Sequence, residues 1–404
     1  MHKIRFSHDI EVPSEQTKLF LACPQLGPRV VFISGGNGAS AIAQSIKLYT
    51  HNSKYIVTMF DDGGSSKVIR EAFDMPPPGD TRNLLIHLAD ETDQGNPKIK
   101  EVFAHRISRT EYQTEILQKE LDSFIRLSNP KILAVEQGLA NIISMYLDYF
   151  NKRKPDDFNL RGASIGNLVM VGCYLLHGRD FENAVYLISS LTKVRGTVIP
   201  VTLGNYHLGA ELDSGQKIYG QANITSCYEH YSSSIKRIFF IESKQPGSKE
   251  QKVEANPRAK SALLDADAIV FSIGSFYTSI LPSLMTLGIA ETIRCSKASK
   301  IFLANSVADE ETKGLPLSQI ISIFGDLCKS SDSSSGSLMD YVQYIVANDH
   351  GNSDNYRGIG NYIPVDIERI NKLGPVVLEF PLEIRRGIYN PDLLSRILLS
   401  FVHI

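Results

Sequence analysis

One glycine-rich segment of the chain has the spacing of a phosphate-binding loop. Residues 34–40 have the sequence SGGNGAS, and Gly36, Gly38 and Ala41 fit the GxGxxG/A pattern between a strand and a helix. Because glycine has no Cβ atom, phosphate oxygens can approach the backbone N–H groups at the start of that helix. We predict phosphate binding by Gly35, Gly36, Asn37 and Gly38. The alternative is a tight turn without a ligand.

Two adjacent carboxylates open a second polar loop, residues 60–66. Asp61 and Asp62 suit a hard cation such as Mg²⁺, which proteins hold with one or two carboxylates together with water or ligand phosphates. The next four residues can donate hydrogen bonds to phosphate or sugar oxygens: Gly63, Gly64, Ser65 and Ser66. The alternative is an Asp-capped helix after a solvated turn.

A stiff, proline-rich turn at residues 76–83 presents three more polar side chains. Arg82 has the forked guanidinium that grips phosphate or carboxylate, and Asn83 is a further candidate for ligand binding. Asp80 and Arg82 are the catalytic candidates. In the alternative interpretation, Asp80 only caps the helix predicted over residues 84–89.

A fourth loop, residues 274–279, also follows an apolar strand and precedes a helix. Five of its residues are expected to contact the ligand: Gly274, Ser275, Tyr277, Thr278 and Ser279.

Asn167 is a weaker candidate, because a polar residue among apolar neighbours is equally suited to an internal cap. Ser164 fits the GxSxG pattern of serine hydrolases, but no convincing strand precedes it, which argues against that chemistry.

Short apolar strands must position these loops. The strands are predicted over residues 29–34, 55–60, 266–273 and 300–304. A helix over residues 39–49 joins the first two and forms the βαβ unit of a parallel sheet. Since parallel strands end at one edge of their sheet, the loops at residues 34–40 and 274–279 should open onto a single crevice.

The rest of the chain adds two features to this α/β unit. Apolar residues at steps of three and four predict a helical insert over about residues 97–156, and residues 198–241 predict a small antiparallel β segment. No internal repeat is evident. We therefore expect one domain over residues 1–404.

Composition narrows the class of protein. The net charge of −2 gives no overall field that would attract nucleic acid or an anionic membrane, so we expect neither partner. Five scattered cysteines without a CxxC pair argue against a thiolate zinc site and against a disulfide framework. The N-terminus does not resemble a signal peptide, and no apolar run is long enough to span a membrane. A cytoplasmic location is expected.

Taken in order, these loops resemble the CofD-like family, which includes phospholactate transferases of the CofD type and gluconeogenesis factors of the YvcK type. The resemblance covers about residues 29–310 and rests on seven motifs: Gly35-Gly-Asn-Gly38, Asp61-Asp-Gly-Gly-Ser-Ser66, Pro77-Pro-Gly-Asp-Thr-Arg-Asn83, Gly166-Asn-Leu168, Val194-Arg-Gly196, Ala255-Asn-Pro257 and Gly274-Ser-Phe-Tyr-Thr-Ser-Ile280.

The resemblance implies a Rossmann-like three-layer α/β/α fold with a mostly parallel sheet. CofD-type members use Mg²⁺ to transfer a phospholactyl-type group from a GDP-linked donor to a deazaflavin alcohol, and the residue matching Asp80 contacts the deazaflavin. YvcK-type members bind UDP-sugars and act in carbon metabolism and cell-wall regulation, with no established reaction. The transferase is our first hypothesis and the UDP-sugar-binding factor our second. The sequences of two loops, residues 61–66 and 274–280, are nevertheless closer to the YvcK branch. A homodimer is the expected assembly.

Some positions depart from the family pattern. Asn37 stands where Thr or Val is common, Ile273-Gly274 replaces the usual Gly-Pro-Gly of the YvcK branch, and the insert is longer than in that branch. The nucleotide base and the acceptor therefore stay open. An NAD-dependent dehydrogenase is the remaining rival, but Asp61 and Asp62 lead into another glycine loop rather than ending a ribose-binding strand.

Overall fold

The computed structural model describes residues 15–226, 233–332, 336–349 and 361–402. Its centre is a seven-stranded sheet in which every strand pairing is parallel. In spatial order the strands are β11 (Val376–Phe380), β10 (Tyr344–Asn348), β9 (Ser299–Leu303), β8 (Ala268–Phe271), β1 (Val30–Ser34), β2 (Lys54–Val57) and β3 (Thr197–Pro200). The predicted parallel sheet is confirmed.

The direction of the chain across the sheet reverses between β1 and β8. From β1 the chain passes through α2 (Gly36–Ile46) to β2 on one side, whereas from β8 it passes through α15 (Ile289–Cys295) to β9 on the other. Right-handed crossovers in opposite directions place their helices on opposite faces of the sheet, which gives the three layers. The strands β1 and β8 are completely buried, as their apolar sequences require.

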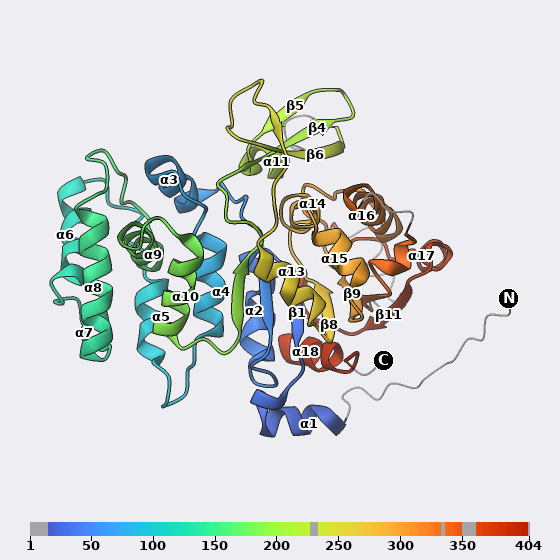
Figure 1. Ribbon diagram of the computed structural model, residues 1–404, viewed down its shortest axis with the longest axis horizontal. Helices are drawn as coiled ribbons and strands as arrows, with labels where there is room; N and C mark the ends of the chain where they lie inside the picture. Colours follow the sequence, from blue (N-terminus) through green and yellow to red (C-terminus); the bar gives the residue numbers. More distant parts are fainter. Residues whose placement is uncertain (1–14, 227–232, 333–335, 350–360, 403–404) are drawn as a thin grey trace.

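The remaining helices cover the sheet or extend from it (Figure 1). They are α1 (Glu15–Ala22), α3 (Gly64–Phe73), α4 (Gly79–Leu88), α9 (Ile165–Leu176), α10 (Phe181–Thr192), α13 (Pro257–Leu264), α14 (Leu281–Met285), α16 (Leu317–Asp332), α17 (Ile367–Leu373) and α18 (Pro391–Leu399). α2 packs against α4 and α18, while α15 packs against α13 and α16. None of the helices in the described ranges is long and apolar enough to cross a membrane.

The predicted helical insert is present beside the β3 end of the sheet (Figure 1). It consists of α5 (Pro97–Ala104), α6 (Thr114–Ile125), α7 (Pro130–Leu133) and α8 (Gln137–Asn151). α8 packs along α9, and buried side chains such as Ile143, Leu147 and Phe150 explain the apolar periodicity. The insert thereby has a core continuous with that of the sheet domain.

The antiparallel segment begins later in the chain than predicted. Residues 197–200 form β3, which pairs with β2 in the main sheet, and the separate sheet has the order β5-β4-β6-β7. Its elements are β4 (His207–Leu212), β5 (Lys217–Tyr219), α11 (Gln221–Thr225), β6 (Ile235–Ile241) and β7 (Glu250–Gln251). A two-stranded hairpin, β12 (Glu383–Arg385) and β13 (Ile388–Tyr389), lies near the C-terminus.

Candidate functional site

The loops that follow β1 and β8 are in direct contact. A Cβ atom on Gly38 would overlap the carbonyl oxygen of Ile273 and would lie 3.0 Å from the Cα atom of Gly274. Gly274 itself has a φ of +144°, which residues with side chains rarely adopt. The prediction that both loops open onto one crevice is therefore confirmed at the level of geometry.

This glycine-loop crevice has a volume of about 190 Å³. It is lined by Gly35, Gly36, Gly38, Thr58, Asp61, Asp80, Gln221, Gly274, Ser275, Thr278 and Ser279. The first turn of α2 lies at the crevice, and the backbone N–H groups of a helix's first turn have no partner within the helix. The side chain of Asn37 lies outside the described part of the structure.

Thr58, just after β2, offers the crevice a buried hydroxyl group. Its side chain is 2% exposed, and its hydroxyl has no hydrogen-bond partner among the described residues. Buried hydroxyls are nearly always hydrogen-bonded, and leaving one unpaired costs about 1–3 kcal/mol. An oxygen-rich ligand in the glycine-loop crevice would satisfy this group.

Asp80 lies between the N-termini of two helices and does not cap its own. Pro78 is the N-cap of α4, no side chain caps that end, and Asp80 belongs to the first turn. Its carboxylate instead lies against α2, where a Cβ atom on Gly36 would be 2.6 Å from Oδ1. Burial and the neighbouring Asp61 carboxylate raise the pKa of Asp80 to about 7, against the opposing effects of the Gly36 N–H and Arg82.

The carboxylate that faces Asp80 across the site is Asp61, whereas Asp62 points elsewhere. Asp61 lines the crevice together with Asp80, and its Oδ1 accepts a hydrogen bond from the Gly63 N–H at 3.1 Å. Asp62 is 3% exposed, accepts from the Ala222 N–H at 2.7 Å and lies 3.8 Å from Lys244. The structure thus separates the predicted metal pair and brings Asp61 and Asp80 together instead.

A divalent cation fits at Asp61, beside Asp80, only with help from a ligand. Among the described residues, no group of three or more His, Cys, Asp or Glu side chains could hold a metal ion. Mg²⁺ is commonly held by one or two carboxylates plus substrate phosphates, and these two carboxylates border a crevice suited to phosphates. The donor set therefore fits Mg²⁺ bound jointly by protein and diphosphate.

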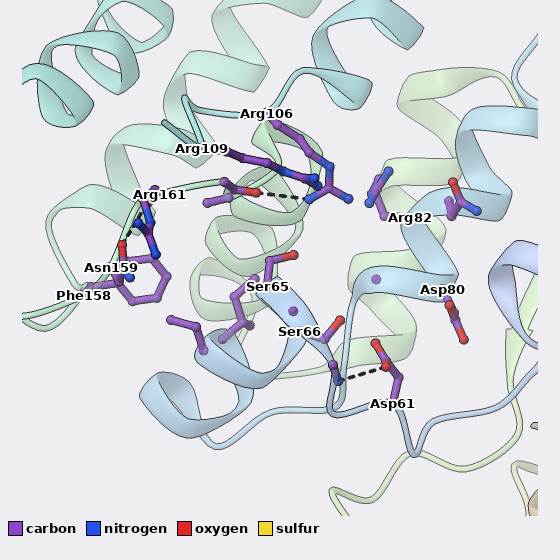
Figure 2. A pocket seen from close by; sticks show the side chains of 18 of the residues that line it. Asp61, Ser65, Ser66, Asp80, Arg82, Arg106, Arg109, Phe158, Asn159 and Arg161 are labelled. Atoms are coloured by element: carbon purple, nitrogen blue, oxygen red, sulfur yellow. Dashed lines mark hydrogen bonds between the residues drawn. The ribbon is translucent and has the colours of Figure 1, made fainter. Parts of the chain in front are cut away.

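A second and larger cavity, of about 800 Å³, is also bordered by Asp61 and Asp80 (Figure 2). We call it the arginine cavity. Both aspartates line it, as do Gly63, Gly64, Ser65, Ser66, Arg82, Asn83, Arg106, Arg109, Tyr112, Asn159 and Arg161. The two aspartates therefore stand where the crevice and the arginine cavity meet.

Two predicted asparagines act as positioning residues. Asn167 is completely buried, accepts a hydrogen bond from Arg82 Nε at 3.0 Å and donates to Ser65 Oγ at 3.2 Å. Asn83 donates to Gly36 O at 3.2 Å and to Ser40 Oγ at 2.7 Å, which ties α4 to the first turn of α2.

Ser164, of the GxSxG pattern, is completely buried and donates to Phe103 O, so it offers no nucleophile.

Tyr277 was predicted to contact the ligand, but its side chain is buried against Phe276 and lines neither cavity. Its loop is held instead by Glu311, which sequence reasoning missed. Glu311 accepts from Thr278 Oγ1 at 2.7 Å, from Tyr277 N at 3.1 Å and from Thr225 Oγ1 at 3.0 Å. Burial and the nearby Asp309 carboxylate raise the pKa of Glu311 to about 7.

Glu311 should make the stability of the protein depend on pH. The pKa is raised on folding from 4.5 to about 7, so the stabilisation is complete below pH 4.5 and is lost as the pH rises to about 7. The full loss is about 3 kcal/mol. Urea unfolding at pH 5 and pH 8 should show a smaller pH dependence in Glu311→Gln than in the wild type. An unchanged pH dependence would contradict this role.

Three arginines of the larger cavity were also missed: Arg106, Arg109 and Arg161. Arg106 and Arg109 lie within the insert, between α5 and α6, and Arg161 lies after it, between α8 and α9. A basic cluster in those connections is visible in the sequence, but only the packing of α8 on α9 brings the two segments together.

Comparison with known proteins agrees with the fold and the motifs. The family model described as 2-phospho-L-lactate transferase CofD matches residues 30–382. A putative gluconeogenesis factor from Nostoc sp. is 29% identical over 387 residues, which is 93% of this chain and 69% of the relative. Another, from Thermoanaerobacterium thermosulfurigenes, is 31% identical over 279 residues, 69% of this chain and 68% of the relative.

A solved structure is similar over nearly the whole fold. The crystal structure of protein BH3568 from Bacillus halodurans, a member of the UPF0052 family, superposes with a TM-score of 0.68 at 25% identity. The superposition covers 92% of this chain and 99% of that one. By its sequence, its sheet order and its loops, this chain belongs to the CofD family.

Proposed function

We propose that the glycine-loop crevice binds the diphosphate of a nucleotide-linked compound, and that the protein transfers a group from this donor to an acceptor in the arginine cavity. The observation that carries the proposal is the meeting of two cavities at Asp61 and Asp80. A crevice between two helix-opening glycine loops suits a diphosphate, and a separate cavity suits a second substrate.

The reaction would be phosphoryl-type transfer to an alcohol: the alcohol oxygen bonds to the distal phosphorus of the donor, the phosphoanhydride bond breaks, and a nucleoside monophosphate leaves. An alcohol attacks phosphorus poorly until its proton is removed, and most of the catalysis comes from positioning and charge stabilisation. Asp80, with a pKa near 7, is suited to accept that proton, while Arg82 lies beside it to balance negative charge. Mg²⁺ held by Asp61 and the diphosphate would supply further charge neutralisation, and Asp80 would stay free to take the proton.

The second candidate function is a UDP-sugar-binding factor without turnover. It is favoured by the names of the similar proteins, several of which are gluconeogenesis factors. Both candidates need the same diphosphate site. A transferase consumes its donor when an acceptor is added, whereas a binding factor does not, and mass spectrometry of the donor distinguishes them. For the transferase, a GDP-linked phospholactyl donor and a deazaflavin alcohol are the first substrates to try.

Ligand binding is tested by a thermal-shift panel of GDP, UDP, UDP-sugars, NAD and deazaflavin, with and without Mg²⁺. We expect a nucleotide diphosphate to raise the melting temperature of the wild type. Gly38→Ala should abolish this shift, because the added methyl group overlaps Ile273 O and forces the two loops apart. Gly138→Ala, in α8, is the matched control, since its Cβ atom meets only the flexible Glu136 side chain at 3.3 Å.

A nucleotide shift that persists in Gly38→Ala would place the ligand elsewhere. If Gly38→Ala melts too early to be measured, Ser279→Ala offers a milder change on the same wall of the crevice. It should reduce the shift without loss of the fold.

A further inference from the structure

Four arginines from three separate parts of the chain line the arginine cavity. Arg82 lies in α4, Arg106 and Arg109 follow α5, and Arg161 precedes α9. Figure 2 shows Arg106 and Arg109 extending into the cavity, with Arg161 on one side and Arg82 on the other. Folding thus concentrates positive charge in one cavity of a chain whose net charge is −2.

Among the described residues these arginines form no ion pair, although Asp80 acts on the charge of Arg82 from a longer distance. Within the described residues, no carboxylate oxygen lies within 4.0 Å of the guanidinium nitrogens of these four arginines. Several arginines elsewhere do form ion pairs, as Arg195 does with Asp90 at 2.6 Å. Arg82 is buried, Arg106 is half-buried, and Arg109 and Arg161 are exposed. Like charges brought together in one cavity cost free energy, most of all where they are buried, and an anion in the same cavity would recover it.

Among the described residues, three of the four arginines have side-chain contacts, all with neutral groups, that hold them in place. Arg82 donates to the amide of Asn167, and Arg106 Nη1 donates to Gly162 O at 3.1 Å. The Arg161 guanidinium lies 4.5 Å from the centre of the Tyr112 ring. Burial and the proximity of Arg109 lower the pKa of Arg106, which agrees with uncompensated charge at this point.

We propose that the arginine cavity binds a polyanion, meaning a compound with at least two phosphate or carboxylate groups. Guanidinium groups bind phosphate and carboxylate through paired hydrogen bonds, so several forks in one cavity select for several anionic groups. The Ser65 hydroxyl and the Asn159 amide supply further donors on the same wall. A neutral alcohol would leave Arg106, Arg109 and Arg161 without an anionic partner.

This inference also specifies the acceptor, and that part of it rests on the proposed function. Asp80 lies at the end of the cavity that meets the glycine-loop crevice, whereas Arg106, Arg109 and Arg161 line the rest of it. An acceptor with a hydroxyl group at one end and anionic groups at the other would place the hydroxyl near Asp80.

Isothermal titration calorimetry of the full chain tests the site without any nucleotide. The probes are fructose 1,6-bisphosphate, with two phosphates, citrate, with three carboxylates, and neutral fructose. We expect the wild type to bind at least one of the two anions and not fructose. Arg106→Gln combined with Arg109→Gln should weaken this binding by about 100-fold, since each replaces charge-assisted hydrogen bonds.

The matched control is Arg153→Gln, an exposed arginine that lies 3.5 Å over the ring of Tyr149 and outside the cavity. It should leave the affinity for the anions within about two-fold of that of the wild type, because distant sites are energetically independent. Arg161→Gln alone, on an exposed loop, replaces the double variant if the latter does not fold. It should weaken binding by about 10-fold, which is the loss expected for one such contact.

Two outcomes would overturn the proposal: neither anion binds to the wild type, or the cavity variants bind as tightly as Arg153→Gln. The nucleotide panel is a separate measurement. If the anions bind but no nucleotide does, the proposed function fails while the polyanion site stands. If nucleotides bind but the anions do not, the polyanion site fails while the proposed function stands.

Discussion

Asp80→Asn should lower turnover by about 100-fold or more while donor binding is kept. Asparagine can still accept the hydrogen bond from the Gly36 N–H through its amide oxygen, so the contact with α2 survives. It cannot accept a proton from an acceptor alcohol. Because the variant also removes a negative charge beside the diphosphate, donor affinity should stay equal or rise.

The measurement combines donor consumption, followed by mass spectrometry, with donor affinity from calorimetry. Asp93→Asn is the matched control, because Asp93 is exposed and lies outside both cavities. It should change neither quantity. A folded Asp80→Asn protein with unimpaired turnover would remove Asp80 from the mechanism.

The pH dependence of the reaction should follow the same residue. Asp80 must be ionised to accept a proton. In the metal-free site burial and Asp61 raise the pKa of Asp80 to about 7, and a cation at Asp61 would lower it, so turnover should rise with pH and level off at or below about pH 7. The raised pKa also affects stability. The folded protein favours the neutral carboxyl group of Asp80, so the free energy of unfolding falls as the pH rises from 3.8 to about 7. Activity and stability therefore respond to pH in opposite directions at this group.

The position of the crevice could be predicted from the sequence because it depends on local pattern and on a general property of parallel sheets. Apolar runs ending in glycine loops at residues 34–40 and 274–279 indicate strands with loops at the same sheet edge. The prediction needed no knowledge of which strands are neighbours. β1 and β8 are in fact adjacent, so their loops touch.

The residues at the centre of the site were harder to predict, because orientation decides their roles. Successive side chains of an extended chain point to opposite sides, so Asp61 and Asp62 diverge just after β2. Asp61 faces the cavities, while Asp62 binds the start of α11. The partner of Asp61 is Asp80, 19 positions along the chain, and only the packing of α4 beside α2 places it there.

The arginine cavity depends on contacts that no local pattern contains. Arg106 and Arg161 lie 55 positions apart and meet because Arg106 pairs with Ser164 in an isolated antiparallel bridge. In the same way, Glu311 holds the loop at Thr278 from a connection after β9. Such residues become candidates only once the fold has placed them.

Removal of divalent metal should weaken binding of the nucleotide diphosphate by about 100-fold. Two carboxylates border the crevice, and unit charges roughly 6 Å apart repel by about 2.8 kcal/mol at an effective dielectric constant of roughly 20. A cation between them and the diphosphate removes this repulsion. Calorimetry in Mg²⁺ and in EDTA measures the effect, and unchanged affinity in EDTA would count against the metal.

Asp61→Asn and Asp62→Asn form a matched pair that locates the metal, since the two residues are adjacent and the change is the same. Asp61 lines both cavities, so Asp61→Asn should remove a ligand of the cation and reduce the effect of EDTA to about three-fold or less. Asp62 accepts a hydrogen bond from Ala222 N–H, a contact that an asparagine oxygen can keep. Asp62→Asn should therefore keep the full effect of EDTA, and the opposite ranking would restore Asp62 as the ligand and displace Asp61.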